Sequence, residues 1–263
     1  MKLEQIKEIT EKATEQLAAE LSAGRSETLL GYLKAISRFH RYSLHNVMLI
    51  ALQKPYASYV AGFHAWNKLG RHVKKGEKGI LIMAPLVRHK TDRDTQEDSA
   101  VVVGFRAASV FDISQTDGQA LPSIGSITGD PQGHIARLHS FAQAHGIAIE
   151  YSDRIAPARG TSYGGRIAIL PDLQPAEEFA TLAHELAHEL LHRSDRRNAT
   201  SKTVRETEAE ATAFVMCHAI GLETGSASSD YIQLWNGDAK MLAESLTYIR
   251  QAASEILVAL TDE

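Results

Sequence analysis

The sequence has 263 residues, long enough for two compact domains, and 44% of them are hydrophobic while 23% are charged, as in a globular protein. The net charge of -4 excludes a uniformly basic nucleic-acid-coating protein, and the single Cys217 excludes an intramolecular disulfide and a cysteine-built zinc finger. The N-terminus lacks an apolar signal core and the longest apolar stretch, residues 79–87, cannot span a bilayer, so we expect a cytoplasmic protein with no membrane partner.

The N-terminal half is expected to begin with helices and to continue with a small sheet. Residues 3–22 and 25–53 repeat apolar positions at helical spacing, which predicts two or three helices. Residues 79–87 and 100–111 are rich in Val, Ile and Phe and predict two strands. Between residues 112 and 133 the chain becomes rich in Gly, Ser, Thr, Asp and Pro, so the linker between domains is expected there.

A cluster of basic residues lies between residues 66 and 90, a segment that contains seven lysines and arginines and one acidic residue, Glu77. Aromatic residues lie within and beside this cluster. Cations that follow a phosphate backbone, with rings on which bases stack, are typical of single-strand binding. The alternative is a solvated lysine-rich loop above an ordinary aromatic core. The residues expected to contact DNA are Phe63, Trp66, Arg71, Lys74, Lys75, Lys78 and Arg106.

The block from Trp66 to Ile80 is the most specific motif of this half, and it is preceded by Gln53-Lys-Pro-Tyr-Ala57 and Val60-Ala-Gly-Phe63. Together these motifs resemble the N-terminal domain of ArdC-type antirestriction proteins. In that family the domain binds single-stranded DNA and a metallopeptidase-like domain follows it. The resemblance therefore implies single-stranded DNA as a partner, with a DNA-binding domain at 1–118, a linker at 119–133 and a metallopeptidase domain at 134–263.

The C-terminal half is expected to start with a helix at residues 135–145 and two short strands at 148–151 and 166–170. A strand just ahead of a peptidase helix suits the chemistry, because an extended substrate can pair with an exposed sheet edge. Tyr163 is expected near that edge. It either helps to stabilise an oxyanion or packs within a turn.

The pentapeptide His184-Glu-Leu-Ala-His188 has the spacing of a zinc-hydrolase helix. At about 100° per residue, positions four apart lie on one face and roughly 6 Å apart along the axis, so both imidazoles can reach one metal ion. Glu185 projects beside them and is expected to accept a proton from a water that the metal activates. His192 lies roughly 12 Å from His184 along an unbroken helix, too far to share the metal, and is expected to support a ligand or to pack.

The third ligand is expected from the segment that follows Val204, whose apolar positions repeat at helical spacing. Glu206 and Glu210 share a helix face, whereas Glu208 points about 160° to 200° away. One of the two carboxylates on the shared face would bind the metal and the other would hydrogen-bond a ligand histidine. The alternative is a solvated acidic face.

This pair of segments resembles the gluzincins and, within them, the ImmA/IrrE metallopeptidases. The resemblance implies a Zn²⁺ site in which Glu206 is the ligand, with Glu210 standing where that family has Asn or Asp. The run after His188 departs from the plasmid ArdC form and is closer to ImmA/IrrE.

The sequence therefore predicts an α+β protein: N-terminal helices with a small antiparallel sheet, then a zincin-like helical metallopeptidase domain with a small sheet. The expected function is that of a single-stranded-DNA-binding zinc metallopeptidase that acts on DNA-associated or regulatory proteins, in antirestriction or protection of mobile DNA. Two alternatives stay open. One is a non-catalytic DNA-protecting protein with a structural or vestigial zinc site, and the other is a regulatory protease that cleaves a repressor.

Overall fold

A computed structural model describes residues 3–24, 27–91, 98–119, 131–222 and 239–261, and it has the predicted α+β fold. It forms two compact units, one of residues 1–13 and 45–124 and the other of residues 14–44 and 125–263. Each unit thus combines two separate stretches of the chain. The expected linker at 119–133 falls mainly on residues outside the described ranges, and the division into 1–118 and 134–263 stays a prediction.

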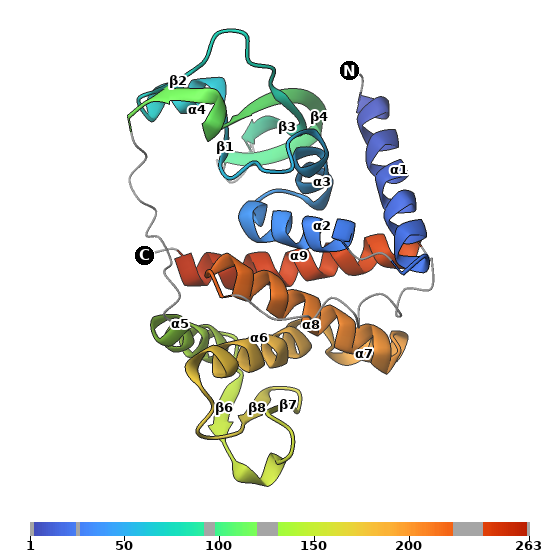
Figure 1. Cartoon of the computed structure of the whole chain (residues 1–263), viewed down its shortest axis with the longest axis vertical. Coiled ribbons are helices and arrows are strands. Elements are labelled where there is room, and N and C mark those ends of the chain that lie inside the picture. The colour runs from blue at the N-terminus through green and yellow to red at the C-terminus, as the bar shows by residue number, and fades with distance from the viewer. Residues whose placement is uncertain (1–2, 25–26, 92–97, 120–130, 223–238, 262–263) are drawn as a thin grey trace. The chain divides into compact units, whose positions relative to one another are not determined.

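The N-terminal half contains both predicted strands and the predicted helices. In chain order its elements are α1 (Leu3–Ser22), α2 (Glu27–Phe39), α3 (Leu44–Gln53), β1 (Val60–Gly62), α4 (Phe63–Lys68), β2 (Arg71–Val73), β3 (Ile80–Thr91), β4 (Asp98–Asp112), the 3-10 turn η1 (Ile113–Gln115) and β5 (Thr116–Gly118). Strands β3 and β4 pair antiparallel from Ile80 opposite Val110 to Thr91 opposite Asp98. They form a sheet of order β1-β4-β3, and β2 pairs separately with β5 (Figure 1).

Two amide side chains of α3 cover the outer edge of β3. Asn46 donates to the carbonyl of Met83 and accepts from its N–H, at 2.9 and 2.8 Å. Gln53 makes the same pair of bonds with Leu81, both at 2.9 Å. An uncovered edge strand offers unpaired backbone groups to other chains, so these bonds both fix α3 against the sheet and close its edge.

The second unit contains the predicted helix and strands of the C-terminal half. Its elements beyond residue 130 are α5 (Pro131–Ala144), β6 (Ala148–Tyr151), η2 (Asp153–Ile155), β7 (Gly160–Ser162), β8 (Arg166–Ile169), α6 (Pro175–Leu191), α7 (Ser194–Ala199), α8 (Lys202–Ala219) and α9 (Ala239–Thr261). Helices α6, α8 and α9 lie side by side (Figure 1). Helix α2 packs against α8. No helix in the described ranges is long and apolar enough to cross a membrane.

A three-stranded sheet of order β6-β8-β7 lies against α6. Strands β6 and β8 are parallel, while β7 pairs antiparallel with β8 and forms an edge. Apolar side chains of α6, including Phe179, Leu182 and Leu186, are fully buried and hold the helix in the core of the unit. The helix is thereby fixed beside β7, the edge strand of this sheet within the described ranges.

Candidate metal centre and basic surface

Helix α6 carries His184 and His188 on a side where they are only partly buried, and Glu185 beside them is buried. Pro175 occupies its first turn, where the missing N–H costs nothing, and two acidic residues in that turn complement the helix dipole. Its opposite side packs in the core. The sequence thus fixes which face of the helix remains available to a metal ion.

Helix α8 presents Glu206 and Glu210 to that face of α6. Ser201 caps the helix by accepting a hydrogen bond from the N–H of Val204. Because α8 packs on α6, Glu206 in the second turn of α8 is brought to the two histidines. Glu210, one turn later, also reaches His184.

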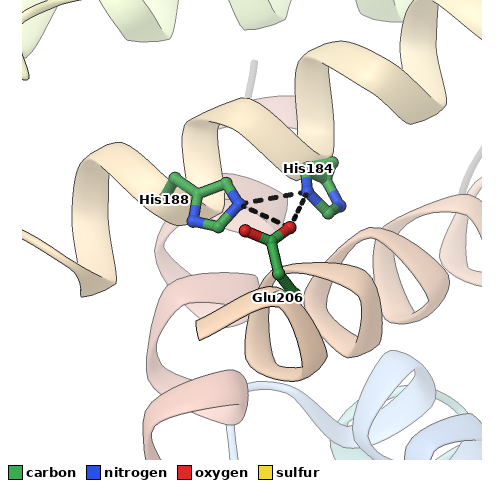
Figure 2. A group of neighbouring side chains, drawn as sticks. All are labelled: His184, His188 and Glu206. Carbon is green, nitrogen blue, oxygen red and sulfur yellow. Dashed lines mark hydrogen bonds and ion pairs between the residues drawn. The ribbon is translucent and has the colours of Figure 1, made fainter. Parts of the chain in front are cut away.

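The three expected ligands lie close together (Figure 2). The Nε2 atoms of His184 and His188 are 3.1 Å apart, and they lie 3.6 and 3.5 Å from Oε2 of Glu206. Ligand atoms about 2.0–2.1 Å from one tetrahedral zinc lie roughly 3.3 Å apart. The spacing and the chemistry of these three donors therefore fit a divalent metal ion.

Glu210 has the geometry of a supporting residue. Its carboxylate lies 3.2 Å from Nδ1 of His184. A carboxylate accepts a hydrogen bond at that nitrogen, so the proton of the neutral ring resides on Nδ1 and the lone pair resides on Nε2, which faces His188 and Glu206. The sequence left open which of Glu206 and Glu210 would take each role, and the distances match the assignment that the gluzincin resemblance implies.

The charges of this cluster favour a cation between its members. Burial opposes protonation of His184, but hydrogen bonds to Glu206 and Glu210 outweigh burial and raise its pKa to about 9. Burial and the charge of His184 lower the pKa of His188 to about 4. The hydrogen bond from His184 lowers the pKa of Glu206 to about 2. Since a metal must displace the proton on His184, metal binding is expected to release protons near neutral pH.

His184, His188 and Glu206 are called the metal triangle below. Glu185 lies beside this triangle and is buried, and burial raises its pKa to about 7. A carboxyl group with a pKa near the working pH is suited to proton transfer. Strand β7 passes close to it: a Cβ on Gly160 would lie 2.8 Å from both Cγ and Oε1 of Glu185. Sequence reasoning missed Gly160, because its role depends on the packing of β7 against α6.

The turn between β7 and β8 carries Tyr163 and is anchored by the buried carboxylate of Glu189. Glu189 accepts hydrogen bonds from Ser162 Oγ and from the N–H groups of Gly164 and Gly165, at 2.6 to 2.8 Å. The ring of Tyr163 is half-exposed, with the Arg166 guanidinium 4.5 Å above it. Its proposed part in stabilising an oxyanion stays a prediction.

Two cavities adjoin the two histidines. One of about 580 Å³ borders His188 and is lined by the turn around Tyr163 together with Arg193 and Arg197. The other, of about 290 Å³, borders His184 and Glu185 and has Phe214 and Cys217 among its walls. A cavity therefore adjoins the candidate centre beside each of its two histidines.

His192 does not reach the metal triangle. It ends α6 and is buried, with its Nδ1 2.9 Å from Nδ1 of His188. The sequence left two roles open, support of a ligand and packing, and this contact with His188 provides the means for the first.

The residues expected to bind DNA differ in exposure: some belong to the core or to the internal contacts of the first unit, and others lie on its surface. Trp66 is fully buried, donates its indole N–H to the carbonyl of Phe111 and packs edge-on against Tyr59. The prediction that Trp66 stacks on bases is therefore wrong, because its ring belongs to the core. Arg71 is also largely used within the fold: its guanidinium bonds to Thr116 and Gly118 and ties β2 to β5.

The other predicted DNA contacts are on the surface. Lys74 donates to the carbonyl of Ser114, whereas Lys75 and Lys78 are exposed in the turn before β3. The ring of Phe63 is 48% exposed and lies 6.5 Å from that of Phe111. Arg106 is exposed on β4, opposite Ala84. Exposed cations and the exposed ring of Phe63 thus occur on this unit, and their contact with DNA stays a prediction.

Comparisons with known proteins agree with both resemblances. Residues 4–111 match the family described as the N-terminal domain of anti-restriction factor ArdC. Residues 141–227 match the peptidase M78 family, described as the IrrE N-terminal-like domain. The second match contains the metal triangle and both helices that form it.

Individual relatives are distant. The uncharacterized protein pXO2-81 of Bacillus anthracis is 24% identical, over 97% of this chain and 51% of its own length, so the chain spans about half the length of this curated relative. The metal-free crystal structure of the antirestriction ArdC protein from the R388 plasmid is 22% identical, with a TM-score of 0.54 and coverage of 95% of this chain and 97% of that chain. The Mn(II)-bound structure of that protein is 22% identical with a TM-score of 0.47, covering 88% and 98%. The chain therefore has the fold of the R388 ArdC protein, and its two halves are similar to the N-terminal domain of ArdC and to the IrrE-like domain of the peptidase M78 family.

Proposed function

We propose that this chain is a zinc-dependent peptidase of the gluzincin type, joined to a domain that binds single-stranded DNA, and that it acts on DNA-associated or regulatory proteins. The observation that carries the proposal is the triangle of His184, His188 and Glu206, whose donor atoms lie 3.1 to 3.6 Å apart. The match of residues 141–227 to the M78 peptidase family supports the same chemistry.

Each residue near the triangle has a part in this proposal. A bound zinc ion supplies a Lewis acid that polarises a peptide carbonyl and activates a water molecule. His184, His188 and Glu206 would hold the ion, and the carboxylate of Glu185 would accept a proton from the attacking water molecule and pass it to the leaving amine. The free edge of β7 pairs with the extended substrate, and Tyr163 borders the cavity beside His188.

The N-terminal domain would bring this site to its substrate. Exposed Lys75, Lys78 and Arg106 supply positive charge, and exposed Phe63 supplies a ring on which a base can stack. The R388 protein with the same fold is described as an antirestriction protein, so protection of incoming mobile DNA is the biological role that we favour. A reducing cytoplasm stays the predicted compartment.

The proposal is tested by metal content and by chelator-sensitive proteolysis of the whole chain. Protein stripped with a chelator and reconstituted with Zn²⁺ is expected to retain about one ion per chain after desalting, as measured by mass spectrometry of the metal. It is then incubated with a mixture of DNA-associated proteins, with and without single-stranded DNA. New cleavage products that vanish on chelation and return with Zn²⁺ are expected.

The two failures have different meanings. A chain that holds no zinc after reconstitution contradicts the metal centre and the peptidase together. A chain that holds one zinc and cleaves nothing in the mixture, while it still shields single-stranded DNA from nucleases, supports the non-catalytic alternative.

Single-strand binding is tested by replacing Lys75 and Lys78 together with glutamine. Both side chains are exposed, so the fold is expected to survive while affinity falls. The slope of log affinity against log salt is expected to become shallower by about 0.7 for each lost phosphate contact. Fluorescence anisotropy with a labelled oligonucleotide measures both quantities.

The matched control removes two exposed charges elsewhere, by Lys7→Gln with Lys34→Gln. This pair changes the net charge equally but leaves the turn before β3 intact. If both double variants lose the same affinity, the effect is one of net charge and the assignment of the surface is wrong.

A further inference from the structure

The buried side of the metal helix holds a second set of polar side chains that begins at His188. Nδ1 of His188 lies 2.9 Å from Nδ1 of His192, and Nε2 of His192 lies 3.0 Å from Oε2 of Glu208. The side chains of His192 and Glu208 are 0% exposed. Burial of a polar group is unfavourable unless the group is hydrogen-bonded. The hydrogen bonds within this set must therefore compensate for the loss of contacts with water.

Glu208 ends this set and is fully satisfied by donors. Arg196 donates to both of its carboxylate oxygens, at 2.7 Å each, and Ser245 Oγ donates to Oε1 at 2.7 Å. The Arg196 guanidinium in turn lies 3.6 Å above the ring of Tyr248. Since Arg196 belongs to α7 while Ser245 and Tyr248 belong to α9, both elements are tied to the metal helix through one carboxylate.

The direction of these hydrogen bonds follows from the acceptor at the end. A carboxylate bonded twice to arginine offers only acceptors, so His192 must carry its proton on Nε2 and donate it to Glu208. The other nitrogen of a neutral His192, Nδ1, is then an acceptor. His188 must therefore carry its own proton on Nδ1. Its lone pair is left on Nε2, the atom that faces His184 and Glu206.

We infer that His192 and Glu208 are positioning residues of the metal centre, and that with Arg196 and Ser245 they fix the tautomer and ring plane in which His188 can bind the ion. The inference rests on the proposed metal centre and goes beyond it, because it makes the centre depend on α7 and α9. It also gives a role to the third glutamate of α8. Glu206 and Glu210 contact the histidines at the metal centre, whereas Glu208 contacts His192 in the buried set.

The two histidines are thus supported unequally. The partner of His184 is Glu210, whose side chain is 49% exposed, whereas the partners of His188 are buried. Solvent can replace a lost partner at an exposed nitrogen but cannot do so at a buried one. Loss of the buried support is therefore expected to weaken metal binding more than loss of Glu210.

The test compares two substitutions of the same residue in the full-length chain. His192→Leu removes both hydrogen bonds but leaves the pair of Glu208 and Arg196 intact, so no buried charge is stranded. His192→Gln can still accept from His188 and donate to Glu208. His192→Leu is expected to weaken Zn²⁺ binding by about 10- to 100-fold, and His192→Gln is expected to recover most of that loss.

Zn²⁺ affinity is measured by competition with a chromophoric chelator, and the visible spectrum of the Co²⁺-loaded proteins reports the ligand geometry. Thermal unfolding of the metal-free proteins provides the readout of structure. A merely structural role for His192 would lower the unfolding temperature of His192→Leu and leave its Zn²⁺ affinity and Co²⁺ spectrum unchanged, and this result would overturn the inference.

A further measurement tests the direction of the hydrogen bonds, and the binding data separate this inference from the proposed function. Nitrogen-15 NMR of the metal-free wild type is expected to show His188 protonated on Nδ1, and protonation on Nε2 would contradict the inferred direction of the hydrogen bonds. If the wild type binds no Zn²⁺ or Co²⁺, the proposed metal centre fails first. If the wild type and both His192 variants bind Zn²⁺ equally, only the positioning role fails.

Discussion

Glu206→Gln is expected to lower the affinity of the centre for Zn²⁺ by more than about 100-fold. Removal of a residue that only supports a ligand costs about 10- to 100-fold, and Glu206 supplies a donor atom itself. The substitution replaces an anionic oxygen, 3.5 and 3.6 Å from the two imidazole nitrogens, with a neutral amide of the same size. Competition with a chelator of known affinity measures the change at fixed pH and salt.

Two further glutamates of the same unit give the controls for this variant. Glu210→Gln removes the partner of His184 Nδ1 and is expected to have a smaller effect, about 10-fold. Glu244→Gln changes an exposed residue of α9 by the same chemical step and is expected to have none. Equal affinities of wild type and Glu206→Gln would show that the third ligand is another group.

The metal triangle could be predicted from sequence because its parts are local. The spacing of His184 and His188 places both side chains on one helix face wherever the helix packs, and the same rule pairs Glu206 with Glu210 on α8. Only the approach of α6 to α8 is non-local, and the family resemblance supplied it. The structure brings the three donor atoms within 4.8 Å of one another, and their binding of a metal stays a prediction.

The base-stacking role of Trp66 could not be judged from local sequence spacing. Its neighbours, Tyr59 and Phe111, include a residue 45 positions away, so burial depends on the pairing of β1 with β4 rather than on local pattern. An aromatic residue beside lysines is typical both of a nucleic-acid surface and of a core covered by a charged loop. The fold decides between these, and for Trp66 it is the core.

Gly160, Glu189 and Glu208 were missed for a related reason. Each acts through contacts with an element distant in sequence: Gly160 with α6, Glu189 with the turn after β7, and Glu208 with α7 and α9. For Glu208 a signal was present. An acidic residue that shares a helix face with apolar neighbours must find buried donors, and His192 and Arg196 were the nearby candidates.

Glu185→Gln is expected to lower the rate constant for peptide hydrolysis by about 10²- to 10⁴-fold while Zn²⁺ affinity stays close to that of the wild type. Glutamine keeps the shape of the side chain and cannot accept the proton. The wild type should lose activity as pH falls through the pKa of Glu185. That pKa is about 7 without a metal, and a neighbouring dication, which favours the carboxylate, should move it lower. This acidic limb is expected to disappear in Glu185→Gln.

Gly160→Ala tests the role of the Glu185 carboxylate without changing Glu185 itself. Its Cβ would meet Thr181 at 2.6 Å and Glu185 at 2.8 Å, both closer than carbon atoms approach without movement, so the carboxylate must shift. Activity is expected to fall with Zn²⁺ binding retained, because the ligands lie outside this contact. The control is Gly31→Ala in α2, where nothing lies within 4 Å.

Combination of the two substitutions decides whether they act on one group. In the Glu185→Gln background there is no proton acceptor left to displace, so Gly160→Ala should cost little further activity, whereas independent sites would give multiplicative losses. If Glu185→Gln retains full hydrolysis, the proton acceptor is another residue. If it abolishes hydrolysis but the chain still protects incoming DNA, protection does not require proteolysis.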